Sequence, residues 1–568
     1  MISISGHTIT FSKTLWSEDE LELAMCLGFT HHVDTNVVSC DITVTAPLAV
    51  LEFTKKVLPE WVSPHLGGKL QSEPVWIDIR NAYKLLFEER TNLFKEKVPY
   101  WGKFYKHQKQ TLLESIDRDH NLWAIEQRMG KTITALTLSM LRDDKCTVFV
   151  TLNTPKWSIP KEVSKEFGLD RMQFSVLDSA ESRTIRAFLI EKVIFINYEA
   201  VGKYKIYLLE RKPTHWILDE VVKVKNHTTS NHKHIASIIT TLKEQGINPK
   251  ITMLSGMPIR NRVNDLFAYF KLVGHHLGKN YAKFMRDFTH TSAAFGGQKV
   301  KGGKNLDELF VKMSNFMIRK TRAECMDVPK KITKNLYFEM GDYKAEFEKA
   351  LEELAQTRNV MDIEKYIHTL NIITSKSKIT GIIDVAESLI EAGKKIVIFS
   401  SYNEPLRLLE EYFKERCVKV TGAVVDPRER EHLRTRFWED EKIEVFLGNR
   451  MACSMGIDLS CASDVIHCDF SLVPDEIEQA NARVDHMKKN KEINIYHSFA
   501  EGSLDEDLLA LISSKAKDIN AVINRDNKGQ LNYENIPQEL YKKMLERLAV
   551  KTDFSHSEDG IKVKTETK

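Results

Sequence analysis

The sequence has few features of a membrane, secreted or zinc-binding protein. No apolar run among its 568 residues is long enough to cross a bilayer, and its first residues lack a basic segment followed by an apolar one. Its eight cysteines are scattered, without a Cys-x-x-Cys pair or a Cys/His cluster of zinc-ligand spacing. We therefore expect a protein of a reducing compartment, the cytoplasm or, in a eukaryote, the nucleus, without membrane contact.

The sequence also lacks a strong charge imbalance, since 82 lysines and arginines face 79 aspartates and glutamates, for a net charge of +3. Overall charge therefore neither requires nor excludes a nucleic-acid partner, and any basic surface must be local. The composition, 42% apolar and 28% charged, is that of ordinary globular domains. The length exceeds what one hydrophobic core supports, so we expect about three or four domains.

One stretch, residues 121–132, has the order of a phosphate-binding loop. A short apolar run predicts a buried strand, and Gly130-Lys131-Thr132 ends the turn before a helical pattern begins. Loop N–H groups and the helix N-terminus would face an anion, with Lys131 on the β- and γ-phosphates and the Thr132 hydroxyl on Mg²⁺. Ile125 stands where the strict pattern has glycine, so the alternative is a strand-turn-helix with a chance Gly-Lys-Thr sequence.

A second nucleotide-binding pattern is the apolar run 215–218 that ends in Asp219-Glu220. An aspartate at the carboxyl end of a strand suits a water-mediated Mg²⁺ contact, and the adjacent glutamate suits a general base for the attacking water. Alone, such a pair is usually a solvated strand end. After a phosphate loop in the same α/β segment, it predicts hydrolysis of ATP with Mg²⁺.

Patterning divides the chain into five segments. Residues 1–98 predict a small α+β module whose residues indicate no chemistry, and 99–275 alternate strands with helices as a mostly parallel sheet covered on both faces does. Residues 276–375 predict a helical insertion and linker, 376–525 resume the strand-helix alternation, and 526–568 predict a helix and a disordered polar tail. The expected fold class is α/β, with two parallel-sheet lobes in tandem.

Further motifs follow one another between about residues 100 and 525. Together they resemble the Swi/Snf-like ATP-dependent DNA translocases and helicases of superfamily two, in a phage- or bacterial-type member. The resemblance implies RecA-like lobes, a DNA-dependent ATPase, and a host-cell cytoplasm if the chain is phage-encoded. The segments that carry the resemblance are 104–108, 151–155 with Trp157, 197–199, 219–220 with 225–226, 254–259, 316–320, 328–330, 396–402, 420–422 with 428–437, 456–459, 464–469, 479–483 and 502–506.

The resemblance also implies which residues form the sites. Glu220, Lys131 and Arg483 would be catalytic, and Thr132 and Asp219 would hold the metal. The ATP site would comprise Gln108, Met129, Gly130, Lys131, Thr132, Asp219, Glu220, Gly456, Asp458, Gln479 and Arg483. The nucleic-acid contacts would be Asn153, Thr154, Lys156, Ser255, Gly256, Ser400, Ser401, Asn449 and Arg450.

Two other segments allow two interpretations. Lysines in the loop 298–304 would grip a nucleic acid, or the loop is an ordinary solvated turn. Trp157 would stack on a base, although a large aromatic near a strand end more often packs into a core, which is the expectation here.

Four departures from the family pattern bear on activity. Arg128 replaces the first glycine of the phosphate loop, and we expect its side chain to point outward from the turn. Val221-Val222 replace Ala-His, Arg450-Met451 occupy the region before the motif V glycine, and His486 stands where motif VI has a second arginine. A histidine is only partly charged at neutral pH and stabilises a transition state less dependably.

These observations predict an ATP-dependent translocase that remodels duplex or branched DNA, in the manner of DNA repair or recombination enzymes, with protein partners unknown. The alternatives are a strand-separating DNA or RNA helicase and a nucleic-acid-binding scaffold with a degenerate ATPase. No bromo-, chromo- or zinc module accompanies the two lobes.

Overall fold

The computed structural model describes most of the chain up to residue 505. The expected C-terminal helix and tail, together with Thr154, Gly456 and His486, lie outside the described residues. The described residues are 2–57, 74–153, 155–168, 174–177, 192–259, 263–294, 297–325, 331–356, 360–424, 426–453, 457–469, 474–485, 492–503 and 505.

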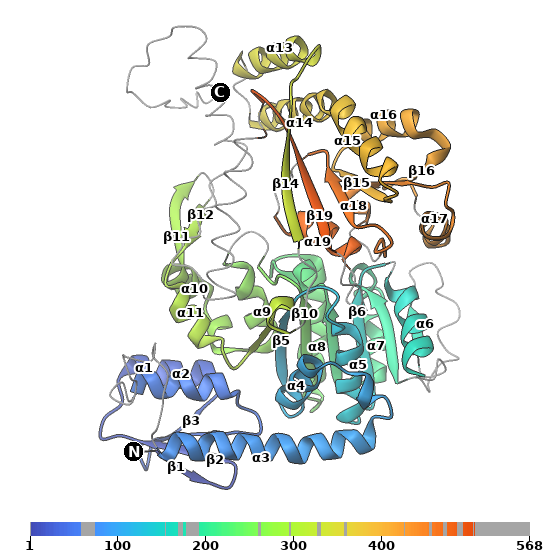
Figure 1. Cartoon of the computed structure of the whole chain (residues 1–568). Helices are drawn as coiled ribbons and strands as arrows, with labels where there is room; N and C mark the ends of the chain where they lie inside the picture. Colours follow the sequence, from blue (N-terminus) through green and yellow to red (C-terminus); the bar gives the residue numbers. More distant parts are fainter. Residues whose placement is uncertain are drawn as a thin grey trace.

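The N-terminal module is α+β, as predicted. Its four antiparallel strands lie in the order β1-β2-β4-β3 and pack against two helices over a core of phenylalanines. A longer helix, α3, runs from this module along lobe 1, on the side away from lobe 2 (Figure 1). The elements are β1 (Ile2–Ser5), β2 (Thr8–Ser12), α1 (Glu18–Leu27), β3 (Thr30–His32), β4 (Val37–Asp41), α2 (Pro47–Val57) and α3 (Pro74–Lys97).

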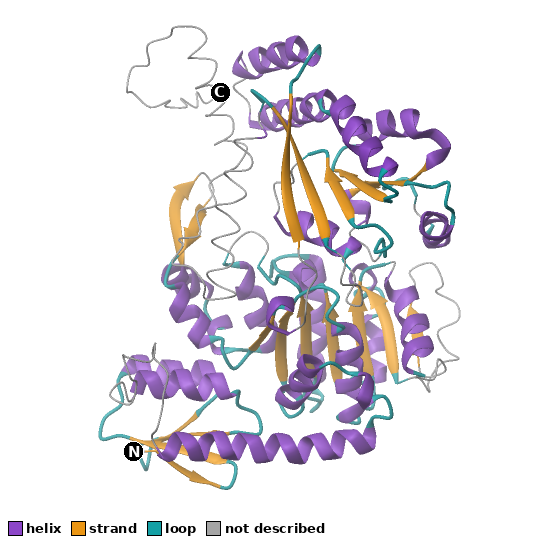
Figure 2. Ribbon diagram, viewed as in Figure 1, coloured by secondary structure: helices purple, strands orange, loops and turns teal. Residues whose placement is uncertain are grey.

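Lobe 1 is built on a seven-stranded parallel sheet in the order β13-β5-β10-β9-β6-β8-β7, with helices on both faces (Figure 2). Its central strands are continuous apolar runs because both faces are covered, and each face has its own hydrophobic cluster. The strands are β5 (His120–Ile125), β6 (Thr147–Thr151), β7 (Phe174–Leu177), β8 (Val193–Asn197), β9 (His215–Asp219), β10 (Lys250–Ser255) and β13 (Met317–Lys320). The helices are α4 (Lys106–Ser115), α5 (Lys131–Leu141), α6 (Pro155–Phe167), α7 (Lys205–Arg211), α8 (Ser230–Glu244), α9 (Asp265–Val273), α10 (Tyr281–Phe288), α11 (Leu306–Lys312) and α12 (Arg322–Cys325).

Lobe 2 repeats this design with six parallel strands in the order β14-β19-β18-β15-β17-β16. The two parallel sheets confirm the predicted α/β class with RecA-like lobes in tandem. The strands are β14 (Lys331–Phe338), β15 (Ile396–Ser400), β16 (Cys417–Val420), β17 (Val445–Asn449), β18 (Asp464–His467) and β19 (Ile493–Ala500). The helices are α13 (Tyr343–Gln356), α14 (Val360–Ser377), α15 (Ile379–Glu391), α16 (Asn403–Phe413), α17 (Pro427–Glu439), α18 (Arg450–Cys453) and α19 (Pro474–Val484).

The segment expected to be a helical insertion and linker contributes strands to both sheets. β13 pairs with β5 at the edge of lobe 1, and β14 pairs with β19 along eight residues at the edge of lobe 2. A two-stranded hairpin, β11 (Thr289–Ala294) with β12 (Gly297–Gly303), also lies in this segment. Edge strands need only one hydrogen-bonded partner and one covered face, so they lack the continuous apolar run that marks a central strand.

Candidate functional site

The phosphate loop leaves the carboxyl end of β5 and turns directly into α5. Gly130 has φ +74°, a left-handed conformation that glycine adopts without strain. A Cβ at this position would lie 2.1 Å from Nε2 of Gln108, so a larger residue would also displace that side chain from the loop. The first turn of α5, which begins at Lys131, therefore presents its N–H groups next to the loop.

Lys131 is held at the loop by two backbone carbonyl groups. Its Nζ donates to the carbonyl oxygens of Ile125 and Glu126 at 2.9 and 3.0 Å. Burial lowers the pKa of Lys131, while the nearby carboxylates of Glu220 and Asp219 oppose that shift. The ammonium thus lies between the loop and the acidic pair, at the position where it can exchange backbone carbonyls for phosphate oxygens.

Gln108 connects helix α4 to the phosphate loop. Its Oε1 accepts from the Tyr105 amide at 2.9 Å, and its Nε2 donates to the Met129 carbonyl at 3.4 Å. His107, which the sequence interpretation missed, lies 3.0 Å from the same carbonyl oxygen through Nε2. Burial lowers the pKa of His107. Its only signal in the sequence is its place beside Gln108.

Asp219 and Glu220 follow β9, which neighbours β10 and lies one strand from β5. The Thr151 hydroxyl donates to Asp219 Oδ2 at 2.9 Å, and the Tyr198 hydroxyl donates to the Asp219 carbonyl at 2.7 Å. Burial, reinforced by the charge of Glu220, raises the pKa of Asp219 to about 6. Glu220 has φ +50°, which turns the chain sharply at the end of the strand.

The valines that replace Ala-His are structural. Val221 is fully buried in the lobe 1 core and Val222 is 8% exposed. A histidine at the second position would have had to find a hydrogen-bond partner there, whereas valine needs none.

Arg483 of lobe 2 comes close to this acidic and basic cluster of lobe 1. Burial and the charge of Arg128 together lower the pKa of Arg483 to about 10, and the charge of Glu220 opposes the shift. The pKa of Lys131 responds in turn to the charge of Arg483. Gln479 is buried on the same helix, α19, and Asp458 lies across the cleft from the loop. The structure therefore places Arg483 and Asp458 of lobe 2 at the phosphate loop of lobe 1, each through a hydrogen bond from Arg128.

Arg128 extends across the cleft to lobe 2. Its guanidinium donates to the carbonyl oxygens of Asp485 at 2.5 Å and Arg483 at 2.7 Å, and to Asp458 Oδ1 at 3.2 Å. The predicted outward direction is confirmed, but the side chain enters the other lobe rather than solvent.

Thr132 and Asp219 fit a magnesium ion in chemical terms, because a hydroxyl and a carboxylate supply the hard oxygen ligands that Mg²⁺ prefers.

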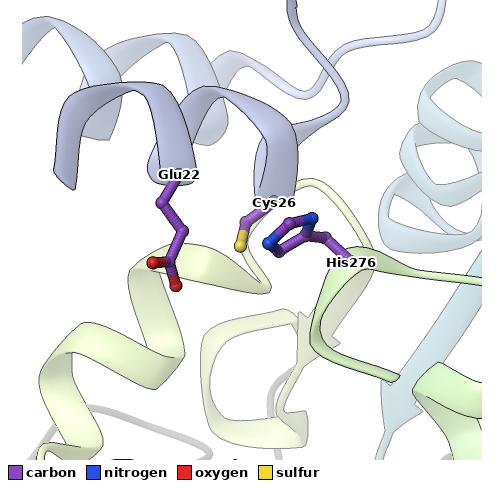
Figure 3. Close-up of side chains that lie close together, drawn as sticks. All are labelled: Glu22, Cys26 and His276. Carbon is purple, nitrogen blue, oxygen red and sulfur yellow. The ribbon is translucent and has the colours of Figure 1, made fainter. Parts of the chain in front are cut away.

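A second group of side chains that could ligate a metal, Glu22, Cys26 and His276, lies where the N-terminal module meets lobe 1 (Figure 3). There Lys283 and Lys312 each donate to Glu22 at 2.8 Å. The two lysine ammonium groups therefore neutralise the Glu22 carboxylate in the position that a metal ion would take.

The nucleic-acid candidates of lobe 1 differ in accessibility. Asn153 is exposed beyond β6. Lys156 is fully buried and donates to Asn197 Oδ1 at 3.0 Å, so its ammonium is used inside the lobe. Trp157 is 36% exposed, so the expectation that it is a core residue is wrong.

Ser255 and Gly256, at the end of β10, lie against the phosphate loop. Ser255 is buried and its Oγ accepts from the Met257 amide. A Cβ on Gly256 would lie 3.3 Å from Cγ of Gln127, so glycine allows this segment to approach the loop closely.

The candidates of lobe 2 surround a residue that the sequence interpretation did not single out, Asp469. Its carboxylate accepts from the Ser400 hydroxyl and the Ser401 amide, and pairs with Arg450 at 3.0 Å. Ser400 and Arg450 are 0% and 1% exposed. Asn449, which is half-buried, donates to the Ser401 carbonyl at 3.1 Å. The carboxyl ends of three neighbouring strands are thereby joined into one rigid corner.

Two family models match the chain, "SNF2-related domain" over residues 126–386 and "Helicase conserved C-terminal domain" over residues 377–505. The chain belongs to the Swi/Snf-like ATPases of helicase superfamily two. The two matches follow each other in the order in which the two lobes do, and they include all the described nucleotide-site residues except Gln108.

Relatives of this Swi/Snf-like chain come from bacteria and animals. It is 21% identical over 503 residues to an uncharacterized ATP-dependent helicase of Mycoplasma pneumoniae, covering 79% of the chain and 46% of the relative. It is 22% identical to a SWI/SNF-related matrix-associated actin-dependent regulator of chromatin subfamily A-like protein 1 homolog of Caenorhabditis elegans, covering 73% of the chain and 61% of the relative. The human DNA annealing helicase and endonuclease ZRANB3 is 20% identical, with 74% and 40% covered. The chain thus spans roughly half the length of these relatives.

Among solved structures, the Sulfolobus solfataricus SWI2/SNF2 ATPase core in complex with dsDNA matches with 18% identity and a TM-score of 0.35, covering 78% of this chain and 96% of that one. Within the described part of the Swi/Snf-like chain, no helix is long and apolar enough to span a membrane.

Proposed function

We propose that this Swi/Snf-like chain hydrolyses ATP in the interlobe cleft and uses the cycle to move along double-stranded DNA. The observation that carries the proposal is the position of Arg483 of lobe 2 at the phosphate loop of lobe 1, where its carbonyl oxygen accepts from the Arg128 guanidinium at 2.7 Å. An arginine from one lobe facing a phosphate loop and an acidic pair on the other is the arrangement that phosphoryl transfer needs.

Lobe 1 supplies the binding half of the cleft. Loop amides from residue 129 onward and Lys131 bind the phosphates, with Lys131 exchanging the carbonyl oxygens that it contacts now. Thr132 and Asp219 would hold Mg²⁺, which would supply positive charge beside the phosphates. Because burial raises the pKa of Asp219, a bound cation would favour its carboxylate form.

Glu220 and Arg483 perform the chemical step. Glu220 orients and deprotonates the attacking water, and Arg483 stabilises the charge that develops on the transferred phosphoryl group. An arginine in this role accelerates hydrolysis by roughly 10³- to 10⁵-fold in NTPases of related design. Because Arg483 belongs to lobe 2, its contact with the γ-phosphate adds to the contacts that hold the lobes together, and hydrolysis removes that contact.

Nucleic acid would be held by backbone and short polar side chains. Asn153 of lobe 1 and Ser401 and Asn449 of lobe 2, whose corner Asp469 holds in place, suit contacts with phosphates, which position a duplex without reading its sequence. A relative named as a DNA annealing helicase supports DNA as the polymer. Opening and closing of two lobes that both grip one backbone converts each ATP turnover into a step.

Steady-state ATPase measurements test the proposal. We expect duplex DNA to stimulate hydrolysis, and Lys131→Ala and Glu220→Gln to abolish the stimulated rate, while Lys145→Ala, an exposed lysine of the same lobe, leaves it unchanged. Stimulation by single strands or RNA alone would support the strand-separating helicase instead. A rate that neither substitution lowers would support the nucleic-acid-binding scaffold and refute the motor.

A further inference from the structure

Two arginines of lobe 1 grip one short segment of lobe 2. Arg128 donates to the backbone carbonyls of Arg483 and Asp485 and to the carboxylate of Asp458. Arg322 forms a bidentate pair with the carboxylate of Asp485, in which NH2 lies 2.9 Å from Oδ1 and NH1 donates to Oδ2. We call these five residues the interlobe clasp.

The clasp is built like an interior contact rather than a surface ion pair. Asp485 is 0% exposed and Arg322 is 7% exposed, and Lys331 lies 3.8 Å from the same carboxylate. Buried charges persist only when they are paired and hydrogen-bonded, and a bidentate arginine–carboxylate contact also fixes orientation. The two lobes are therefore held in one relative geometry at this point.

The lobe 1 half of the clasp is anchored to the phosphate loop. The Arg322 amide donates to Glu126 Oε2 at 2.9 Å, and Arg319 lies 3.3 Å from the other oxygen of that carboxylate. Arg128 itself has φ +60°, a left-handed conformation that is unfavourable for any residue with a Cβ. Its three hydrogen bonds across the cleft offset that cost.

The lobe 2 half of the clasp carries Arg483. Arg128 holds the carbonyl of Arg483, and both arginines hold Asp485, just beyond the end of α19. Fixing the backbone on both sides of Val484 sets the direction in which the Arg483 side chain leaves the helix. The charge of Arg128 beside that of Arg483 further disfavours any drift of Arg483 back toward the clasp.

We propose that Arg128 is a positioning residue, which together with Arg322 clasps residues 483–485 and aligns Arg483 with the phosphate loop. The inference rests on the proposed ATP hydrolysis. Arg128 thus belongs to the phosphate loop of lobe 1 but acts on Arg483 of lobe 2. This role is separate from phosphate binding by Lys131 and the loop amides.

The test compares Arg128→Gly with Lys212→Gly in the full chain. Both substitutions replace a non-glycine residue of positive φ, but Lys212 is an exposed helix cap remote from the clasp. We expect Arg128→Gly to lower kcat by ~10- to 100-fold, because small displacements of catalytic groups have effects of that size. KM for ATP should change by less than about threefold, since glycine keeps the loop conformation and the phosphate contacts. Arg128→Lys should have nearly as low a kcat as Arg128→Gly, because one ammonium cannot satisfy three acceptors in fixed directions.

A second measurement separates failure of the clasp from failure of the proposed function. Small-angle X-ray scattering without nucleotide should show a larger radius of gyration for Arg128→Gly and for the double variant Arg322→Gln/Asp485→Asn than for the wild type and Lys212→Gly. Unchanged scattering together with an unchanged kcat overturns the clasp while the ATPase stands. A wild type without ATPase refutes the proposed function, and the scattering comparison still decides whether the clasp holds the lobes.

Discussion

The carbonyl oxygen of Arg483 accepts a hydrogen bond from the Arg128 guanidinium at 2.7 Å, although 355 residues separate the two in sequence. One residue belongs to the phosphate loop of lobe 1 and the other to the last helix described in lobe 2. The contact links the loop of lobe 1 directly to the backbone that carries the Arg483 side chain.

Gly130→Ala should weaken nucleotide binding. The added Cβ would collide with Gln108 and would also occupy a left-handed conformation at about 1–2 kcal/mol of strain. We expect the affinity for a fluorescent ATP analogue to fall at least ~10-fold. Gly102→Ala is the control, because no atom lies within 4 Å of its Cβ position. Equal affinities for the two variants would contradict the loop geometry.

Asp469→Ala should destabilise lobe 2. The substitution removes the acceptor for Ser400 and Ser401 and leaves the buried guanidinium of Arg450 without its carboxylate. Breaking a buried ion pair from one side costs about 3–5 kcal/mol. Thermal unfolding should show a lower midpoint for this variant, whereas Glu441→Gln, on an exposed turn, should match the wild type. An unchanged midpoint for Asp469→Ala would show that the corner is not held by this carboxylate.

Asn153→Ala and Lys156→Ala should have different effects although both positions follow β6. Asn153 is exposed, so its loss should weaken duplex binding and leave stability intact. Lys156 is buried on Asn197, so its loss should lower the melting temperature by a few degrees and leave an unsatisfied amide. Fluorescence anisotropy and thermal scans measure the two effects. Weaker duplex binding by Lys156→Ala at an unchanged melting temperature would place Lys156 on the nucleic-acid surface and contradict the prediction.

Glu22→Gln should destabilise the docking of the N-terminal module in a pH-dependent way. Although burial raises its pKa, Lys283 and Lys312 hold the pKa of Glu22 at about 2, below the ordinary value of 4.5. A lowered carboxylate pKa stabilises the fold above the unfolded value, and the effect is lost as pH falls through the range from 4.5 to 2. We expect a difference on the order of 1–2 kcal/mol at pH 7, after allowance for solvent screening, that shrinks below pH ~4.5. A difference independent of pH would refute the ion-pair explanation.

Much of the fold and of the nucleotide site could be predicted from local sequence. The strands that precede Gly130 and Glu220 are apolar runs because both faces of the sheet are covered, and the glycine marks a turn that few other residues can form. Edge strands were harder to recognise. β14 is half-exposed along its length, and its residues carry no continuous apolar run.

The contacts between distant residues could not be predicted. Arg322 and Asp485 are 163 residues apart, and nothing near either one indicates a partner in the other lobe. Because lysines are seldom buried, the sequence predicts that Lys156 lies at the surface. Its burial depends on the hydrogen bond to Asn197, which is 41 residues away in the sequence. Sequence patterns report periodicity and local turns, whereas these pairings depend on how two lobes pack.

The most direct test of the account is displacement of the third strand from a DNA triplex in the presence of ATP and Mg²⁺. A translocase that moves along a duplex strips the third strand while the duplex stays paired. We predict ATP-dependent release by the wild type, no release by Glu220→Gln, and no separation of a plain fork under the same conditions. Fork unwinding without triplex release, or triplex release that persists in Glu220→Gln, would contradict ATP-driven movement along double-stranded DNA.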